Sequence, residues 1–318
     1  MAKLKLLVIS GPTASGKTEF GIRLAEELGG EIISADSMQI YKGLNIGTAK
    51  PTKEEQARVP HHLIDILEPH ESYSVAAFLK DAEAVSEDIT ERGKLPIVVG
   101  GTWLYIDSLL KGREFSEEGE EEFRRLTRKE LTERYDEIGG NAMLNELRQF
   151  DPERAERLAA NDKKRIVRAY EFYLLTGKTI TQFDKESQER KSKFKSLCFA
   201  LGFKERKTLY DRIERRAEKM LSEGILEEAA YLMSLKLPRS AGAMQAIGYK
   251  ELFPYLRGEC TLDDAETELK KNSRRYAKRQ LTFMRAAENL NWIEFDLMPD
   301  MDFAMREALS IIEKEKFL

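Results

Sequence analysis

The chain has 318 residues, of which 42% are hydrophobic, and this suffices for one large or two medium domains with their own cores. A net charge of −4 argues against an indiscriminate nucleic-acid binder, and Cys198 and Cys260, outside any C-x-x-C motif, argue against a disulfide framework. No apolar stretch approaches membrane-spanning length, and the first apolar residues are too few for a signal peptide. We therefore expect a cytoplasmic protein with no membrane contact and no obligatory protein partner.

The first predicted elements are a strand, a glycine-rich loop and a helix. The apolar run at 5–9 predicts the strand, and the spacing of apolar residues over 18–28 predicts an amphipathic helix that ends at Gly29-Gly30. Between them, Gly11-Pro12-Thr13-Ala14-Ser15-Gly16-Lys17-Thr18 has the G-x-x-x-x-G-K-[ST] spacing of a phosphate-binding loop. Its backbone N–H groups and Lys17 would hold phosphate oxygens, and the Thr18 hydroxyl would bind Mg²⁺.

This loop predicts a polyphosphorylated ligand without selecting one. ATP, GTP and prenyl diphosphates present the same oxygens, and the alternative is a glycine-rich turn with no ligand. A second strand, predicted over 31–35, brings Asp36 to the same edge. In one interpretation Asp36 caps the following turn or holds Mg²⁺; in the other it is a base, while Ser37 and Gln39 recognise a nucleobase edge.

The next segment contains all three histidines, His61, His62 and His70, and then a helix and a third strand. Four nearby metal ligands are not evident, so we interpret the histidine segment as a structural loop rather than a zinc site. Ser74 is predicted to cap the helix, which Gly93 ends, and residues 95–99 form the strand. The helix would pack through its regularly spaced apolar residues Phe78, Ala82, Val85 and Ile89.

The alternation of strands and helices predicts an α/β fold. We expect a P-loop NTPase-like parallel sheet flanked by helices, with ligands at the carboxyl edge where Asp36 and Thr102 meet the phosphate-binding loop. Charged helical sequence replaces the strand pattern over 116–194, before a buried strand at 195–203. The expected organisation is therefore a core of residues 1–115 and 195–318 with an inserted helical subdomain at 116–194. Residues 292–295 would add an edge strand.

Charge is segregated along the chain. Residues 114–122 are acidic, whereas 163–168, 190–195 and 270–285 are basic. The last of these segments predicts a helix with an apolar stripe of Tyr276, Phe283 and Ala287 beside a basic stripe of Arg274, Lys278 and Arg285. Since the basic stripe does not mix signs, we predict that it binds an anion, either an RNA backbone or a diphosphate.

A set of short segments in fixed order carries a family resemblance. They are Gly-Pro-Thr-Ala-Ser-Gly-Lys-Thr (11–18), Asp-Ser-Met-Gln-Ile-Tyr (36–41), Gly-Thr-Ala-Lys-Pro (47–51), His-His-Leu-Ile-Asp (61–65), Gly-Gly-Thr-Trp-Leu-Tyr (100–105), Asn161-Asp162 with Arg165 and Arg168, Gln-Ala-Ile-Gly-Tyr-Lys (245–250) and Tyr-Ala-Lys-Arg-Gln (276–280). Over nearly the whole chain the sequence resembles bacterial tRNA dimethylallyltransferases. It departs at Trp103, where that family commonly has a small residue.

The resemblance implies transfer of a dimethylallyl group from dimethylallyl diphosphate to N6 of the adenosine immediately 3′ of the anticodon, with Mg²⁺ and release of pyrophosphate. It makes Asp36 the base and adds Lys17, Thr18 and Thr102 to the catalytic set. Residues 11–18 would hold the diphosphate. Arg212 or Arg216, and Arg274, are candidates for adding positive charge there, and the sequence does not choose among them. The inserted subdomain would bind the tRNA anticodon stem-loop. The implied tRNA contacts are Asp36, Ser37, Met38, Gln39, Thr102, Arg124, Lys163, Lys164, Arg165, Ile166, Val167, Arg168, Gln245, Ala246, Ile247, Gly248, Tyr249 and Lys250.

The chemistry of this transfer suits the residues. A carboxylate is too weak a base to deprotonate a neutral amine, so Asp36 would accept the proton while the C–N bond forms. Backbone amides, Lys17 and Mg²⁺ would stabilise charge on the leaving pyrophosphate. Three alternatives remain at this point: an isopentenyltransferase of free adenine nucleotides, which would have little use for the insert; a P-loop kinase; and a nucleotide-gated RNA-binding switch that forms no covalent product.

Overall fold

A computed structural model describes residues 3–113, 121–188 and 192–318 of the chain. They divide into two compact units, Met1–Leu110 with Lys193–Leu318, and Lys111–Ser192. The expected boundary at 116, most of the acidic run at 114–122, and residues 190 and 191 of one basic run lie outside the described residues. None of the helices in the described part of the chain is both long and apolar enough to cross a membrane.

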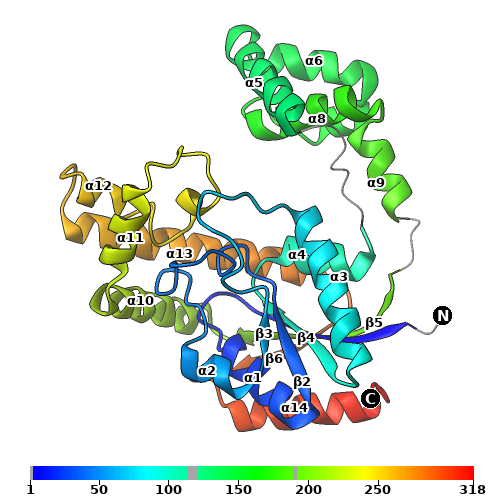
Figure 1. The fold of residues 1–318 in the computed structure, drawn as a ribbon, viewed down its shortest axis with the longest axis vertical. Coiled ribbons are helices and arrows are strands. Elements are labelled where there is room, and N and C mark those ends of the chain that lie inside the picture. The colour runs from blue at the N-terminus through cyan, green and yellow to red at the C-terminus, as the bar shows by residue number, and fades with distance from the viewer. Residues whose placement is uncertain (1–2, 114–120, 189–191) are drawn as a thin grey trace. The chain divides into compact units, whose positions relative to one another are not determined.

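The first unit is built on a six-stranded parallel sheet with helices on both faces (Figure 1). The strand order is β3-β2-β4-β1-β5-β6, and every neighbouring pair is parallel. The strands are β1 (Leu4–Ser10), β2 (Gly30–Ser34), β3 (His61–His62), β4 (Leu95–Gly100), β5 (Phe194–Phe203) and β6 (Leu290–Phe295). The α/β prediction is confirmed, and β6 is the expected edge strand. The histidine segment differs from the prediction of a loop, because His61 and His62 pair with Ile32 and Ile33 as a short edge strand.

One face of the sheet is covered by α1 (Lys17–Leu28), α10 (Arg206–Glu223) and α14 (Met301–Lys314). Phe20 and Leu24 of α1 are fully buried there, as are Ala304 and Ala308 of α14. The helix α1 ends because Gly29 adopts a left-handed conformation with φ of 64° and its N–H bonds back to Ala25 O. The phosphate-binding loop is therefore fixed between a buried strand and a helix anchored in the main core.

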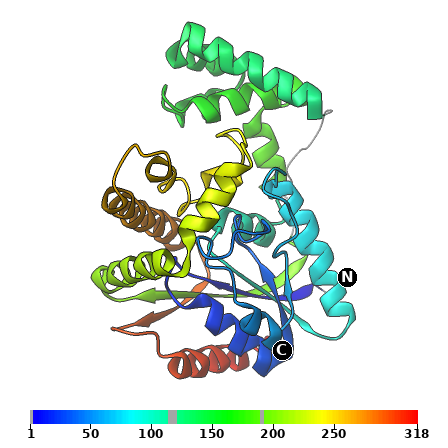
Figure 2. The same cartoon turned by 60° about the vertical axis from the view of Figure 1, so that its left-hand side comes forward.

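The opposite side carries α3 (Val75–Glu91) and α4 (Trp103–Lys111), and α2 (Lys53–Arg58) lies near α1. The predicted cap of α3 is confirmed, since Ser74 Oγ accepts a hydrogen bond of 3.0 Å from Ala77 N. A second core joins the segment around Ile40 and Leu44 to α11 (Ile225–Ser234), α12 (Phe253–Leu256) and α13 (Leu262–Arg285). In both views α10 and α13 lie side by side (Figures 1 and 2).

The predicted apolar stripe on α13 is correct only in part, because Tyr276 is partly buried but Phe283 is exposed. Its buried residues are Ala265, Leu269, Ala277, Gln280 and Met284, whereas the Phe283 side chain is 59% exposed. The helix is longer than the basic segment suggested, and a small alanine and a polar glutamine face inward where an aromatic residue was expected.

The second unit is helical, as expected for the insert. Its helices are α5 (Glu121–Ile138), α6 (Gly140–Phe150), α7 (Pro152–Glu156), α8 (Lys163–Thr176) and α9 (Ile180–Gln188). They enclose a core of their own that contains Leu131, Met143, Leu147 and Ile166. Glu171 of α8 is fully buried, and its carboxylate accepts from Arg128 at 3.0 Å and from Arg168 at 2.8 Å. These paired charges satisfy a carboxylate that would otherwise be costly to bury.

Candidate active site

The phosphate-binding loop at 11–18 wraps a space at the carboxyl edge of β1. Gly16 adopts a left-handed φ of 94° immediately before α1 begins at Lys17. A Cβ on Gly11 would lie 2.5 Å from Ser15 Oγ, so the loop requires glycine at this close approach. Ser15 Oγ is buried and has no hydrogen-bond partner among the described residues. Such an orphaned hydroxyl in a cradle of backbone N–H groups fits a bound phosphate oxygen.

Gln280 of α13 braces this loop. Its Oε1 accepts from Thr13 N at 2.9 Å, and its Nε2 donates to Gly101 O, also at 2.9 Å. A Cβ on Gly101 would lie only 2.3 Å from Gln280 Nε2. One buried amide thus joins the phosphate-binding loop to the end of β4. Sequence reasoning found Gln280 only as part of a motif and missed this role.

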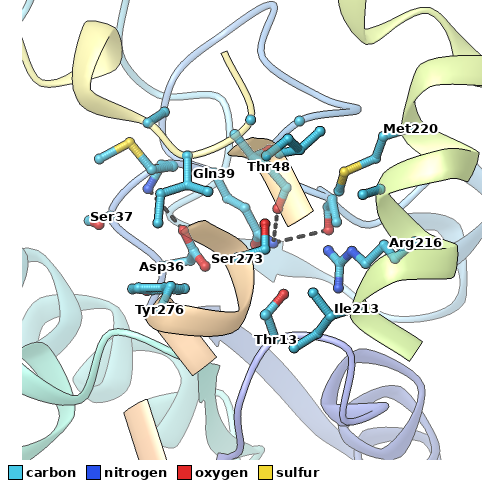
Figure 3. Close-up of a pocket in the computed structure, with 18 of the residues that line it drawn as sticks. Thr13, Asp36, Ser37, Gln39, Thr48, Ile213, Arg216, Met220, Ser273 and Tyr276 are labelled. Carbon is cyan, nitrogen blue, oxygen red and sulfur yellow. Dashed lines mark hydrogen bonds between the residues drawn. The ribbon is translucent and has the colours of Figure 1, made fainter. Parts of the chain in front are cut away.

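The cavity that adjoins the loop, called the main cavity for its place at the loop rather than for its size, has a volume of about 200 Å³ (Figure 3). It brings together most of the predicted site residues of the first unit. Those that line it are Thr13, Lys17, Thr18, Asp36, Ser37, Met38, Gln39, Arg216, Gln245, Ala246, Ile247 and Gly248. Sequence reasoning missed an apolar wall from α10 and α13, which contributes Ile213, Ala217, Met220 and Leu269, and also Ser273.

The cavity contains two cations that the protein does not neutralise. Within the described residues, neither the Lys17 nor the Arg216 side chain forms a hydrogen bond or an ion pair. Burial lowers the pKa of Lys17 to about 8, repulsion by Arg216 adds to this, and Asp36 opposes it. Burial also lowers the pKa of Arg216. Two desolvated cations facing one cavity favour a strongly anionic ligand.

Asp36 has one carboxylate oxygen engaged and one available. Its Oδ1 accepts from Met38 N at 2.9 Å, and no hydrogen bond from the described residues reaches Oδ2. Thr102 supports the same turn, because its Oγ1 accepts from Ser37 N at 3.1 Å. Figure 3 places Asp36 beside Tyr276. The turn-capping interpretation of Asp36 is therefore satisfied by one oxygen, and the other is able to accept a proton.

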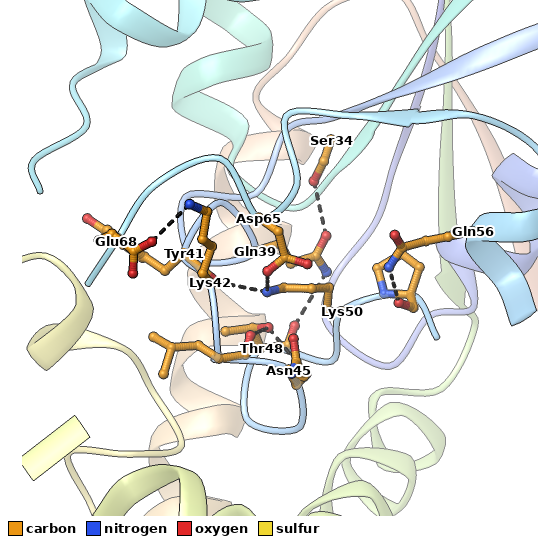
Figure 4. Close-up of polar contacts among 12 residues, drawn as sticks. Ser34, Gln39, Tyr41, Lys42, Asn45, Thr48, Lys50, Gln56, Asp65 and Glu68 are labelled. Carbon is orange, nitrogen blue, oxygen red and sulfur yellow. Dashed lines mark hydrogen bonds and ion pairs between the residues drawn. The ribbon is translucent and has the colours of Figure 1, made fainter. Parts of the chain in front are cut away.

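Gln39 is placed differently from its predicted role in recognising a nucleobase edge. Its Oε1 accepts from Ser34 Oγ at 3.0 Å, and its Nε2 donates to Ala49 O at 3.2 Å and Thr48 O at 3.4 Å (Figure 4). The amide is thus engaged within the protein and holds the loop that forms another wall of the cavity. Lys50 extends this network by donating to Tyr41 O at 2.7 Å and pairing with Asp65.

The wall at 45–49 is also fixed from α11. The Glu228 carboxylate accepts from the backbone N–H groups of Asn45, Ile46 and Gly47 at 2.9 to 3.2 Å. Tyr249 donates its hydroxyl to the same carboxylate at 2.7 Å. Because Tyr249 is fully buried, its role is to support this wall rather than to contact tRNA through its side chain. No motif in the sequence indicated Glu228.

Three further residues of the first unit lie outside the main cavity. Arg212 donates from Nε to Ala14 O at 3.0 Å and lies over the Phe203 ring, so it supports the phosphate-binding loop from outside. Arg274 is ion-paired with Glu214. Trp103 begins α4 and does not line the cavity. Of the three arginines predicted to hold the diphosphate, only Arg216 lines the main cavity, and Trp103 is not among its lining residues.

His61 and His62 each contact a protein acceptor. His61 Nδ1 lies 2.8 Å from Val59 O, and His62 Nε2 lies 2.8 Å from the buried Glu31 carboxylate. Across the described ranges, no group of three or more His, Cys, Asp or Glu side chains is arranged to hold a metal ion. Oxygen donors for Mg²⁺ are nevertheless present, because Thr18 and Asp36 line the main cavity together.

In the second unit, the predicted RNA-binding residues divide into core and surface. The side chains of Ile166 and Val167 are 0% and 4% exposed and belong to the core, so the prediction that they contact tRNA is corrected to a packing role. Lys163 is paired with Asp136 at 2.6 Å, and Arg165 lies 3.4 Å from Asp162. Lys164 is exposed and makes no ion pair with any described residue.

Two other predicted contacts have specific surroundings. Arg124 of α5 has a buried Nε without a partner among the described residues. Lys250 lines a separate cavity of about 240 Å³ in the first unit, with Arg239, Met244 and Arg257. Gln245 lines both this cavity and the main one, so the two adjoin each other at the 245–248 segment.

Comparison with known proteins agrees with this geometry. Residues 39–287 match the IPP transferase family, and residues 4–65 match the isopentenyl transferase family. A tRNA dimethylallyltransferase of Anoxybacillus flavithermus is 46% identical over 311 residues, which cover 97% of this chain and 96% of that protein. A crystal structure of tRNA isopentenylpyrophosphate transferase from Bacillus halodurans is 41% identical with a TM-score of 0.73, covering 99% of this chain and 98% of that one.

A more distant structure extends the comparison beyond bacteria. It is a eukaryotic dimethylallyltransferase acting on tRNA, 29% identical with a TM-score of 0.83, covering 98% of this chain and 80% of that one. The phosphate-binding loop, the aspartate beside it and the helical second unit thus occur together in a chain whose sequence and fold match one family over nearly their full length. This chain belongs to the IPP transferase family.

Proposed function

We propose that the protein transfers a dimethylallyl group from dimethylallyl diphosphate to N6 of the adenosine immediately 3′ of the anticodon in tRNA, and that it acts in the cytoplasm. The observation that carries the proposal is the composition of the main cavity. It joins a cationic phosphate site at Lys17 and Arg216 to an available carboxylate oxygen on Asp36 and to an apolar wall. The names of the related proteins supply the substrate class.

The donor follows from the two ends of the cavity. The diphosphate binds beside Ser15, Lys17 and Arg216. The Ser15 hydroxyl has no partner there, and the two cations are unpaired, so all three are able to contact phosphate oxygens. The dimethylallyl group is apolar and lies against the wall formed by α10 and α13. A nucleoside in the same position would set polar groups against Ile213, Ala217 and Met220. This wall favours a prenyl diphosphate over the ATP of a kinase.

In the reaction, the lone pair of N6 forms the new C–N bond while the allylic C–O bond of the donor breaks. Both electrons of the C–O bond leave on the pyrophosphate, whose charge is stabilised by Lys17, Arg216 and the backbone N–H groups of the loop. Asp36 Oδ2 accepts the N6 proton, and Thr102 keeps the Asp36 turn in place. Thr18 would hold Mg²⁺, which supplies further positive charge at the leaving group.

The acceptor base must leave its stack to enter this cavity, and a hairpin loop makes this extrusion less costly than a duplex does. Ser37, Met38, Ala246 and Ile247 also line the cavity, and we assign them to the flipped adenosine. Lys164 and Arg165 in the second unit are assigned to phosphates of the anticodon stem-loop. These basic side chains are solvent-exposed, which suits contact with an RNA backbone.

The test is to offer the purified protein three reactions and measure product masses. With dimethylallyl diphosphate and Mg²⁺, we expect an anticodon stem-loop to gain one prenyl group on its adenosine, while AMP remains almost unmodified. Prenylated AMP at a rate equal to that of the stem-loop would support the free-nucleotide alternative. Phosphoryl transfer from ATP, or RNA binding with no change in mass, would contradict the proposal in favour of a kinase or a binding switch.

A further inference from the structure

A second, much smaller cavity adjoins the main one. Its volume is about 20 Å³, which is room for a water molecule. Lys17, Thr18, Asp36 and Gln39 line both cavities, and His61 lines only the small one. His61 takes no part in the bond-making and bond-breaking steps of the proposed reaction.

Strand geometry explains why these residues meet. Alternate residues of a strand share a face, so Ile32, Ser34 and Asp36 point to one side as β2 runs to the carboxyl edge. All three line the small cavity. His61 on β3 pairs in register with Ile32 and lies beside it. The neighbouring His62 contacts the Glu31 carboxylate, so the two histidine side chains have different partners.

The hydrogen bonding of His61 fixes which ring nitrogen carries the proton. Val59 O is an acceptor only, so Nδ1, at 2.8 Å, must donate to it. Nε2 then carries a lone pair, and burial lowers the pKa of the ring, which keeps it neutral. Nε2 is buried and has no partner among the described residues, so neither Lys17 nor Thr18 donates to it. A buried acceptor in this position needs a donor that the protein does not supply.

We propose that His61 is a positioning residue for Mg²⁺: its Nε2 accepts a hydrogen bond from a metal-bound water that occupies the small cavity. This inference rests on the proposed function, because that function places Mg²⁺ at Thr18. Mg²⁺ in phosphate sites usually retains several waters, and acceptors beyond the direct ligands orient those waters. Ser34 Oγ and Asp36 offer oxygen acceptors for the second hydrogen of the same water.

Two substitutions distinguish the roles of the two ring nitrogens of His61. In His61→Asn the side-chain amide replaces Nδ1 and keeps a donor for Val59 O, but the acceptor in the cavity is lost. In His61→Gln the longer side chain brings an amide oxygen to the place of Nε2, and the bond to Val59 is lost. His62→Asn is the matched control, since it alters the same strand without facing the small cavity.

The measurement is calorimetric binding of pyrophosphate at a series of Mg²⁺ concentrations, so it needs neither tRNA nor turnover. We expect His61→Asn to raise the Mg²⁺ concentration for half-maximal effect by about tenfold, and His61→Gln to raise it much less. Pyrophosphate binding without Mg²⁺ should be equal in all variants. His62→Asn should bind Mg²⁺ and pyrophosphate like the unchanged protein.

Two results would overturn the inference. The first is an unchanged Mg²⁺ requirement in His61→Asn; if the melting temperature of this variant without Mg²⁺ were also lower, the cavity would be assigned to a structural water. The second is an equal loss in His61→Asn and His61→Gln, which would indicate a packing role for the ring. Failure of the proposed function is distinguishable, because the unchanged protein would then bind Mg²⁺ and pyrophosphate without prenylating RNA.

Discussion

The cations of the main cavity and several basic side chains of the second unit have different surroundings. Lys17 and Arg216 line a cavity without any ion pair from the described residues, and burial lowers the pKa of both. In the second unit, by contrast, Lys163 is paired with Asp136 and Arg168 with buried Glu171. A concave site for a small anion must keep its cations unpaired and desolvated, so each contributes strongly to binding. On a surface that binds RNA, a basic side chain gives up water and exposed partners when it contacts a phosphate. Each such side chain therefore contributes less to the binding free energy, and its contribution depends more strongly on the salt concentration.

Among substitutions of these basic residues, the largest effect on activity is expected at Lys17. Lys17→Ala removes charge from the diphosphate in both the ground state and the transition state, so donor affinity and turnover should both fall, with kcat/KM down by about 10²–10³-fold. The measurement is steady-state kinetics with dimethylallyl diphosphate and the stem-loop, combined with donor binding by calorimetry. A loss confined to turnover, with unchanged donor affinity, would contradict the proposed contact with the diphosphate.

Arg216 and Arg274 form a matched pair on facing helices. Arg216→Ala should weaken pyrophosphate binding by about tenfold, the order of one charge-assisted contact, because this side chain faces the cavity unpaired. Arg274→Ala should change it little, since Arg274 is already paired with Glu214. Calorimetry on both variants makes the comparison. Equal effects would show that the ion pair opens when the donor binds.

The depressed pKa of Lys17 predicts a pH dependence of pyrophosphate binding. Burial, the main cause, lowers the pKa to about 8 in the ligand-free protein, so the lysine loses its charge as the pH rises through 8. Affinity should be greatest below pH 8 and should fall as the pH rises through 8. Lys17→Ala is the control, because it retains only the titration of pyrophosphate itself. Parallel pH profiles for the two proteins would rule out Lys17 as the titrating group.

The basic residues at the start of α8 should each have the smallest effect on binding. Replacing Lys163, Lys164 and Arg165 with Ala should weaken stem-loop binding and lower the slope of log affinity against log salt by about one per lost phosphate contact. Lys163→Ala alone should contribute least, since that ammonium is paired with Asp136. Pyrophosphate binding should be unchanged. An identical salt slope in the triple variant would remove α8 from the RNA interface.

The parts of the molecule that could be predicted from the sequence are those whose structure depends on residues close together in the chain. The phosphate-binding loop follows from the spacing of Gly11, Gly16 and Lys17, and strands β1, β2, β4 and β5 follow from short apolar runs bounded by glycine and polar residues. Asp36 reached the correct edge because parallel strands end on one side of a sheet. These inferences need no knowledge of which helices pack together.

The roles that sequence reasoning missed depend on distant partners. Gln280 braces a loop more than 260 residues earlier in the chain, and Glu228 holds backbone N–H groups about 180 residues away. Ile166 lies within a basic run, but the helices packed around α8 decide that it faces the core. His61 was assigned to a loop because a two-residue edge strand leaves no periodic pattern to detect. In each case the missing information is which surface of an element meets its neighbours.

The central claim is that Asp36 accepts the proton from the acceptor nitrogen inside the cavity. Asp36→Asn retains the size and hydrogen-bonding capacity of the side chain but removes its ability to take a proton. The most direct measurement is single-turnover prenylation of the anticodon stem-loop at saturating dimethylallyl diphosphate and Mg²⁺, comparing this variant with the unchanged protein. We predict a rate lower by about 10²–10⁴-fold with little change in donor affinity. A near-normal rate would contradict the assignment of the base, and a loss that excess Mg²⁺ restores would instead make Asp36 a metal ligand.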